Sequence, residues 1–416
     1  MKLKQTLSHV HPLAWTIIIG TVFGRLAATM SIPYLSIYLV KVLGASSTVA
    51  GLTIAVSTLA GVFASFYGGY LSDRIGRKKV MIISALGWAC VFFGFSGAHA
   101  IWMFFVVNTL NGLCRSMFEP ASRALLSDVT PKEHRLLVFN MRYFGINLGV
   151  VFGPLLGIAL GATQSTFPFV IAGIVYVIYG LIIILQFRLH PKHGDPVDQT
   201  NKPQLLDALK ITSQDRVFLP VLLGTMFCVL GYGYFEATLP QYLTDNPHFH
   251  NGSTLFSYML TLNAITVLVV QYPVVRLSKR LPVVMPIILG NICVTISLLI
   301  LGAAHSLTLL FIGVVIFTVG EVMMFTMMDM LIDRIAKPEW RGTYFGTIGF
   351  NNLGNVIAPI LGGFLIDHLG KDNGPHIFVP LAMTTIIGVP LLLIARKRLL
   401  LHEQEKQQAQ EQVVPL

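Results

Sequence analysis

The chain has 416 residues, of which 54% are hydrophobic and only 12% are charged, and its formal net charge is +10. A soluble domain carries about 25% charged residues, and this much apolar surface would leave large exposed patches in water. The composition therefore excludes a soluble protein and indicates an integral membrane protein. The four cysteines all fall within apolar runs, without the spacing of a disulfide framework, so a secreted disulfide scaffold is excluded as well.

Twelve apolar runs of about 18–27 residues are long enough to cross a bilayer as helices. In chain order we expect spans at 13–40, 49–71, 80–97, 102–126, 137–160, 167–187, 218–243, 255–275, 283–303, 307–332, 344–366 and 377–394. The first run is too long for a signal peptide and no small-residue cleavage pattern follows it, so we expect it to remain in the membrane. The sequence therefore predicts an all-α membrane protein.

The basic residues predict the orientation of these spans. Most of the 29 Lys and Arg residues lie near the N-terminus, in the loops after even-numbered spans, and in the C-terminal tail, whereas the opposite loops hold only Lys41 and Lys371. By the positive-inside rule both termini are cytoplasmic, which requires an even number of spans. The positive charge therefore reports topology rather than a nucleic-acid partner, and we expect a multi-pass protein of the cell (plasma or inner) membrane.

A polar stretch with three prolines is the longest loop and separates six spans from six. We expect an N-terminal six-helix bundle at 1–189, a cytoplasmic linker at 190–216, a C-terminal six-helix bundle at 217–395 and a cytoplasmic tail at 396–416.

The two halves also repeat each other. Asn147-Leu148-Gly149 followed by Gly153-Pro154-Leu155-Leu156-Gly157 reappears about 205 residues later as Asn352-Leu353-Gly354 followed by Ala358-Pro359-Ile360-Leu361-Gly362. Two similar halves on a pseudo-two-fold axis are typical of transporters that rock around a central site. A channel or a membrane enzyme rarely needs that symmetry.

The loop between spans two and three carries the most specific motif. Residues 69–79 read Gly-Tyr-Leu-Ser-Asp-Arg-Ile-Gly-Arg-Lys-Lys, which resembles the cytoplasmic loop motif of the major facilitator superfamily. The resemblance implies that Asp73 faces the N-terminal end of the eleventh helix and that Arg77 pairs with Asp128. The implied conformational latch consists of Gly69, Asp73, Arg74, Gly76, Arg77 and Asp128. The alternative is a loop whose charges only set topology.

The fifth span carries Gly149, Gly153, Pro154 and Gly157. This pattern resembles the antiporter motif of the twelve-span drug:proton antiporters, and the resemblance, which covers residues 10–395, implies the major facilitator fold. It also implies that the glycine face packs against a helix of the other half and disfavours leak. The alternative is ordinary packing of small residues four apart.

Acids within the apolar runs are candidate proton-coupling groups, since a charged residue at midspan costs about 2.5–3.5 kcal/mol. Glu321 lies near the centre of span ten, and Glu236 lies in span seven beside Tyr232 and Phe235. An acid beside aromatic residues also suits a lipophilic cation. The alternative for each acid is a structural hydrogen bond to a neighbouring helix.

The N-terminal half carries arginines within its spans. Arg115 and Glu119 are four residues apart on span four, so we expect them to pair on one helix face, more in a structural role than in coupling. The family's span-four motif has an arginine before a Gln-Gly pair, where this chain reads Asn108-Thr109-Leu110-Asn111-Gly112. Arg115, one turn later, is a candidate for the role of that arginine. Our candidate proton-coupling residues are Glu321, Glu236, Arg142, Arg115 and Glu119, and our candidate substrate-binding residues are Arg25, Asn147, Tyr232, Phe235, Glu236, Glu321 and Asn352.

The sequence contains no phosphate-binding Gly-Lys-Ser/Thr loop, no metal-ligand cluster and no nucleophile–base arrangement. We therefore expect no enzyme activity, no metal and no cofactor, and transport driven by the proton gradient. We expect a monomeric antiporter that exports lipophilic or toxic small molecules. The alternatives are a lipid or glycolipid translocator that would hold an anionic headgroup with its arginines, a sugar or nutrient transporter, and, more remotely, a membrane receptor.

Overall fold

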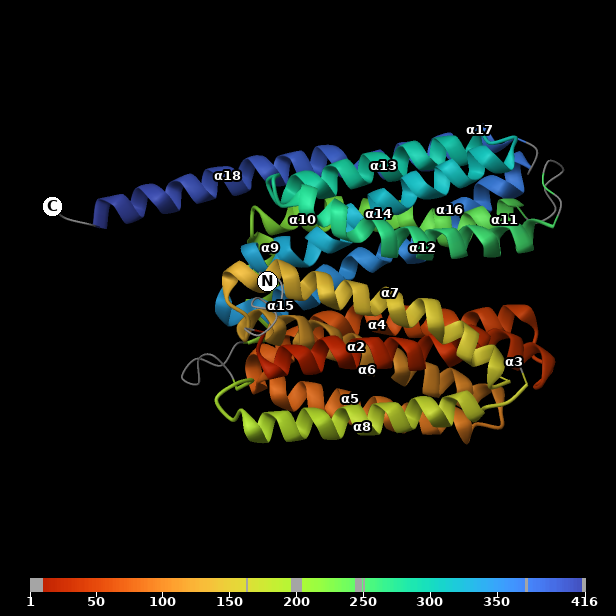
Figure 1. Cartoon of the computed structure of the whole chain (residues 1–416), viewed down its shortest axis with the longest axis horizontal. Helices are drawn as coiled ribbons and strands as arrows, with labels where there is room; N and C mark the ends of the chain where they lie inside the picture. Colours follow the sequence, from red (N-terminus) through yellow and green to blue (C-terminus); the bar gives the residue numbers. More distant parts are fainter. Residues whose placement is uncertain are drawn as a thin grey trace. The chain divides into compact units, whose positions relative to one another are not determined.

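The computed structural model describes residues 10–161, 164–195, 204–243, 249, 251–370 and 373–413, and no strand occurs among them (Figure 1). Among these residues, eleven helical stretches are long and apolar enough to cross a membrane. The predicted fourth span is also a long helix, but a stripe of polar and charged side chains lowers its apolar content. The structure thus has the all-α fold class that the sequence predicts.

The described residues of the first half form seven helices and two helical turns. They are α2 (Pro12–Ser31), the 3-10 turn η1 (Ile32–Tyr34), α3 (Leu35–Lys41), α4 (Ser47–Ile75), α5 (Arg77–Ser96), α6 (Ile101–Asp128), the 3-10 turn η2 (Lys132–His134), α7 (Arg135–Ala159) and α8 (Phe167–Leu189). The predicted first span is therefore not one continuous helix. It is interrupted by η1, which contains a proline that cannot donate a backbone hydrogen bond.

The second half contains the remaining elements. They are α9 (Leu205–Gln214), α10 (Phe218–Gly233), the π-helical turn η3 (Tyr234–Thr238), α11 (Leu239–Leu243), α12 (Gly252–Ser278), α13 (Val284–Gly302), α14 (Leu307–Ile335), the 3-10 turn η4 (Pro338–Trp340), α15 (Arg341–Thr347), the 3-10 turn η5 (Ile348–Asn352), α16 (Leu353–Leu369), α17 (Gly374–Ile386) and α18 (Gly388–Val413). The turn η3 lies about 205 residues after η1, so the first span of each half is distorted at the equivalent place.

The chain forms two compact units. The first comprises Met1–Ala208 and Ala336–Phe350, and the second comprises Leu209–Ile335 and Asn351–Leu416. The division of the chain falls within the predicted linker, but the first unit also includes α15. The eleventh span is thus split at η5, with α15 in the first unit and α16 in the second.

Each unit contains the same packing of small residues. A Cβ added to Gly149 on α7 would lie 2.7 Å from the backbone nitrogen of Leu26 on α2. In the second unit, a Cβ added to Gly354 on α16 would lie 2.6 Å from the backbone nitrogen of Leu230 on α10. The absence of side chains lets the two backbones approach closely in both units. The repeat seen in the sequence is therefore also a repeat of helix contacts.

This packing corrects one implication of the resemblance. The face formed by Gly149, Gly153 and Gly157 was expected to contact a helix of the other half, but it packs against α2 of its own unit. A hydrogen bond also joins α7 to the turn η1 that follows α2, because the Tyr34 hydroxyl donates to the Pro154 carbonyl at 2.9 Å. The proline cannot donate from its nitrogen, but its carbonyl still accepts a bond from the neighbouring helix.

Three histidines meet where α2 begins and α8 ends. The ring of His11 lies 4.8 Å from that of His190 and 4.7 Å from that of His193, measured between centroids. His11 caps α2, since its Nδ1 accepts a hydrogen bond from the Leu13 amide at 3.2 Å. Partial burial and the two neighbouring imidazoles lower the pKa of His11 below its usual value of 6.5. None of the described residues forms a group of three or more ligands placed to hold a metal ion.

We predict that acid weakens this contact. A lowered pKa means that the folded protein favours neutral His11, so the contact contributes fully above pH 6.5 and loses its contribution as pH falls below that value. The thermal unfolding midpoint of the detergent-solubilised protein should fall from pH 7.5 to pH 5.5. His193→Ala removes one repelling imidazole and should make that fall smaller. An equal fall in the variant would contradict the prediction.

Candidate functional site

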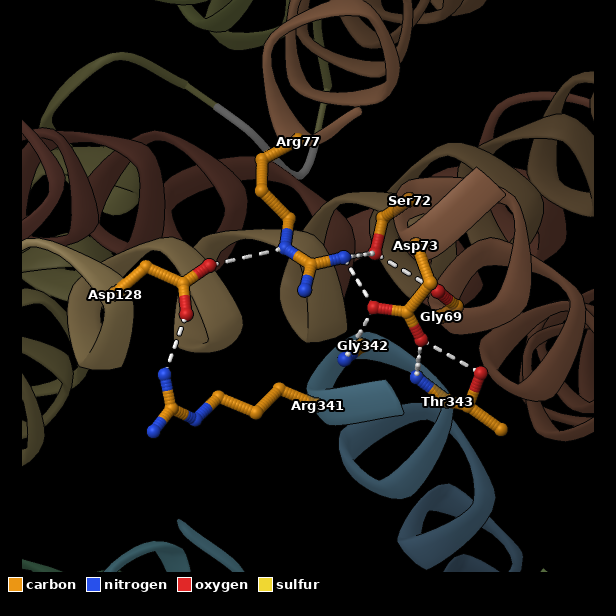
Figure 2. A network of polar contacts seen from close by, with 8 residues as sticks. All are labelled: Gly69, Ser72, Asp73, Arg77, Asp128, Arg341, Gly342 and Thr343. Carbon is orange, nitrogen blue, oxygen red and sulfur yellow. Dashed lines mark hydrogen bonds and ion pairs between the residues drawn. The ribbon is translucent and has the colours of Figure 1, made fainter. Parts of the chain in front are cut away.

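A buried polar network surrounds Asp73 on the last turn of α4 (Figure 2). The Asp73 carboxylate accepts hydrogen bonds from the Gly342 amide at 2.9 Å, the Thr343 amide at 2.6 Å and the Thr343 hydroxyl at 2.6 Å. Both amides belong to the first turn of α15, where the helix dipole favours a negative charge. The contact that the resemblance implied for Asp73 is therefore present, and Thr343 is an additional donor.

Arg77 connects this carboxylate to a second one. Its guanidinium forms an ion pair with Asp73, donates to the Ser72 hydroxyl at 3.1 Å, and donates through Nε to Asp128 at 3.3 Å (Figure 2). Asp128 also accepts a bond from Arg341 at 2.7 Å. Arg341 was not among our candidates.

The remaining latch candidates have different surroundings. Gly76 has a φ of 96° and joins α4 to α5, a conformation that favours glycine. A Cβ on Gly69 would lie 2.9 Å from the Cα of Gly346 on α15, so the helices approach closely there. Arg74 does not join the network, because its guanidinium donates to the Tyr70 hydroxyl at 2.6 Å. Here the prediction that Arg74 belongs to the latch is wrong.

We predict that Asp73→Ala loosens α15 from α4. The change removes three hydrogen bonds to a carboxylate, and bonds to charged groups contribute about 1.5–3 kcal/mol each. Ser65 reports the separation, since it is buried and a Cβ on Gly349 would lie 2.7 Å from its Cβ. In a background without native cysteines, a Cys at position 65 should react with a hydrophilic maleimide about tenfold faster or more in the Asp73→Ala variant.

Asp367→Ala is the matched control for that measurement, because it removes an exposed carboxylate near the end of α16. It should leave labelling at position 65 unchanged. Equal labelling rates with and without the Asp73 carboxylate would show that it does not hold α15 in place.

A second cluster lies midway along the helices of the first unit. The Glu119 carboxylate on α6 pairs through Oε1 with Arg25 on α2 at 2.8 Å, and through Oε2 with Arg142 on α7. Arg115 forms no hydrogen bond with Glu119, so the expected pair on one helix face is wrong. The i,i+4 spacing permits that pair, but arginines of two other helices occupy both oxygens of the carboxylate.

The buried acid of the second unit is Glu321 on α14. Its side chain is 5% exposed, and its Oε2 accepts a hydrogen bond from the Asn263 amide of α12 at 2.8 Å. The same amide also lies 2.9 Å from the Thr318 hydroxyl. Asn263 was missed by the sequence analysis, because a lone amide on another helix carries no local pattern.

Glu236 has a different environment within the same unit. It is exposed and lies in the π-helical turn η3, and its carboxylate accepts a hydrogen bond from the Tyr232 hydroxyl at 2.6 Å. Such single π turns occur frequently at functional sites. The Tyr232 ring lies 5.8 Å from that of Phe317 and 5.3 Å from that of Phe325. Glu236 is therefore an accessible acid beside aromatic side chains.

Three other substrate-binding candidates have different surroundings. Phe235 is 1% exposed and stacks on Phe317 at 4.1 Å, which makes it a core residue of the second unit. The Asn147 amide donates to the Tyr143 carbonyl of its own helix at 3.0 Å. Asn352 is exposed at the end of η5.

Long apolar helices in two repeated halves, with ionisable side chains within the spans, define a multi-pass membrane transporter. The chain belongs to the Major Facilitator Superfamily, which matches residues 17–351 and 221–415. The members of this family are transporters and not enzymes.

Three relatives illustrate the range of the family. The "Uncharacterized MFS-type transporter YqjV" of Bacillus subtilis is 50% identical over 94% of this chain and 95% of its own length. The "Na(+), Li(+), K(+)/H(+) antiporter" of Planococcus maritimus is 26% identical over 82% of this chain and 87% of its own. The "Quinolone resistance protein NorA" of Staphylococcus aureus is 25% identical over 88% of this chain and 92% of its own.

Proposed function

We propose that this transporter is a proton-coupled antiporter that exports lipophilic or toxic small molecules by alternating access. It acts as a monomer in the cell membrane with both termini in the cytoplasm, and it is driven by the proton gradient without a bound cofactor. The observation that carries the proposal is Glu321, a carboxylate buried within a membrane span and bonded to a neutral amide. Relatives named for antiport and for quinolone resistance support the mode and the class of cargo.

The coupling step follows from the chemistry of a buried acid. Desolvation favours the neutral form of a carboxylate, whereas a nearby positive charge favours the ionised form. In the proposed cycle Glu321 and Glu236 take up external protons after the cargo has left, which favours the return to the inward-facing state, and they release these protons to the cytoplasm before new cargo binds. The cluster of Arg115, Glu119 and Arg142 contributes fixed charge in the other half.

The network around Asp73 acts in this cycle as the latch. It consists of charged groups bonded to one helix end, so it can be either formed or broken as a unit. We infer that it stabilises one of the two alternating states and that its breakage accompanies the change to the other.

The proton gradient supplies enough energy for such export. Each charge that crosses the membrane contributes about 2.3 kcal/mol per 100 mV, and each 1.4 kcal/mol corresponds to about tenfold in concentration. One proton can therefore sustain a cargo gradient of roughly fortyfold at that voltage.

The test is proton movement in proteoliposomes that contain the purified protein and an internal pH dye. An anionic dye, a cationic dye, an anionic lipid, a sugar and sodium chloride are supplied in turn, with protein-free vesicles as the control. Antiport predicts that one of these solutes releases a pre-formed pH gradient only when the protein is present. Transport of a solute at the same rate with and without the gradient would overturn the proposal.

A lipid translocator of the same fold is the second candidate, favoured by the arginines of the first unit. In the same assay it would move the anionic lipid and leave both dyes and the sugar in place.

A further inference from the structure

The polar face of α6 carries one charged side chain, that of Arg115, for which the described contacts include no hydrogen bond or ion pair. This face contains Asn108, Asn111, Arg115, Glu119 and Ser122, which recur at helical spacing. Arg115 is nine residues from Val106, about two and a half turns, so the two side chains point to opposite sides of the helix. Val106 belongs to the exposed apolar side of α6 together with Trp102 and Leu110. Arg115 therefore does not point toward the side that faces lipid.

The neighbours of Arg115 on this face have hydrogen-bond partners within the first unit. Asn108 donates to the Thr53 carbonyl at 2.6 Å, and Asn111 accepts from the Trp88 indole at 2.7 Å. Ser122 donates to the Glu119 carbonyl at 2.8 Å. Arg115 differs from all of them, since its side chain is exposed and forms no hydrogen bond or ion pair with any residue that the structure describes.

The charges around Arg115 do not balance. Four arginines, Arg25, Arg115, Arg123 and Arg142, interact electrostatically with the single carboxylate of Glu119, and Arg25 and Arg142 occupy its two oxygens. Arg25 is the charged group that acts most strongly on Arg115, and it repels it. A guanidinium within a membrane span is costly unless it is paired. An anion at Arg115 would supply the missing charge.

The surroundings can also hold an anion by hydrogen bonds. Guanidinium groups present a planar set of donors that fits carboxylate, sulfonate and phosphate oxygens. The buried hydroxyl of Tyr179, which lies near Glu119 and Arg142, has no partner among the described residues and is a further donor in the same cluster. Glu119 keeps Arg25 and Arg142 in fixed positions, so binding at Arg115 needs little rearrangement.

We propose that Arg115 binds an anionic oxygen group of the transported molecule, so that the cargo is an organic anion. This inference rests on the proposed function and specifies the charge of the cargo. The anionic group is either that of a soluble organic acid or that of a lipid headgroup, since both present the same oxygens to the guanidinium.

The charge of the cargo has a consequence for the driving force. Export of one monovalent anion against one proton moves two positive charges inward, whereas export of a monovalent cation against one proton moves none. Each net charge changes the attainable concentration ratio by about fortyfold per 100 mV. An inside-negative potential would therefore accelerate export of the anion directly.

The test compares two probes that share a fluorophore and differ in charge. Dansylglycine carries a carboxylate, and N-dansylethylenediamine carries an ammonium group. Each is titrated into the purified full-length protein in a neutral detergent, and the rise in dansyl fluorescence is recorded. The wild type should bind dansylglycine at least tenfold more tightly than the cationic probe.

Variants assign the difference to Arg115. Arg115→Gln should weaken dansylglycine binding about 10- to 100-fold, as expected for the loss of hydrogen bonds to a charged group, whereas Arg115→Lys should keep much of the affinity. Arg334→Gln removes the same charge from an exposed ion pair with Glu403 and should change nothing. Retained affinity in Arg115→Lys also shows that a loss in Arg115→Gln is not a loss of folding.

Displacement of dansylglycine by lipids identifies whether the anion is a lipid headgroup or a soluble acid. Displacement of dansylglycine by phosphatidylglycerol, and not by phosphatidylcholine, indicates a headgroup, and no displacement by either indicates a soluble acid. Unchanged dansylglycine affinity in Arg115→Gln, equal binding of the two probes, or no binding of either would overturn the inference. Binding needs no proton gradient, so these results are independent of whether the transport is proton-coupled.

Discussion

Replacing Glu321 with Gln is expected to abolish the dependence of transport on the pH gradient while the protein still folds in the membrane. The carboxylate is buried and accepts a hydrogen bond from Asn263. Gln has nearly the same shape and can accept the same bond, but it cannot release or take up a proton. Uptake of protons on addition of cargo should fall to the level of protein-free vesicles, and exchange of labelled cargo without a gradient should persist.

Two further variants make this prediction specific. Glu403→Gln removes an exposed carboxylate from the ion pair with Arg334 and should leave the coupling intact. Glu236→Gln tests the other acid of the second unit. If Glu236→Gln alone abolishes proton uptake and Glu321→Gln does not, the coupling group is the exposed acid in η3 rather than the buried acid on α14.

The membrane-spanning helices could be predicted because they depend on the length of the apolar runs. Runs of about 20 apolar residues must form helices in a bilayer, because every backbone polar group has to be satisfied within the segment. Interruptions within a run do not change its mean hydropathy, and so η3 in the seventh span and η5 in the eleventh could not be located. The break at η1 in the first span coincides with a proline, but apolar length alone did not indicate it either.

The site could be predicted where a motif fixes both partners. The pairing of Arg77 with Asp128 and the contact of Asp73 with the start of α15 follow from the loop motif, and both are present. Asn263 and Arg341 were missed because their partners lie 58 and 213 positions away in the sequence. No local spacing indicates such a pair.

Glu119 shows that a local spacing rule can also predict a wrong partner. The nearest arginine in sequence, four residues away, is the partner that helical spacing favours. In the structure the partners are Arg25 and Arg142, which come from α2 and α7. A buried carboxylate pairs with the cations that the neighbouring helices place beside it. Here Arg25 and Arg142 pair with Glu119, and Arg115 of the same helix does not. The residue that the local rule paired with Glu119 is the one left available for an anion.

Glu119→Gln is therefore expected to destabilise the first unit strongly. The change leaves Arg25 and Arg142, of which Arg142 is 5% exposed, without their common counter-charge. Removing one partner of a buried ion pair costs about 3–5 kcal/mol, because the other charge stays buried and unpaired. The thermal unfolding midpoint in detergent should fall clearly. Glu236→Gln, which removes an exposed acid bonded to Tyr232 on its own helix, should lower it little.

A second substitution distinguishes two causes of the lost stability, the unbalanced charge and the altered packing of this cluster. In Glu119→Gln/Arg142→Gln the two amides can bond to each other, and the buried arginine that has lost its ion pair with Glu119 is gone. If unpaired charge causes the loss, this double variant should regain a large part of the midpoint that Glu119→Gln loses. A double variant that is less stable than either single variant would instead show that the two side chains stabilise α6 and α7 by packing. In that case Glu119 would not stabilise the first unit by neutralising the excess positive charge around Arg115.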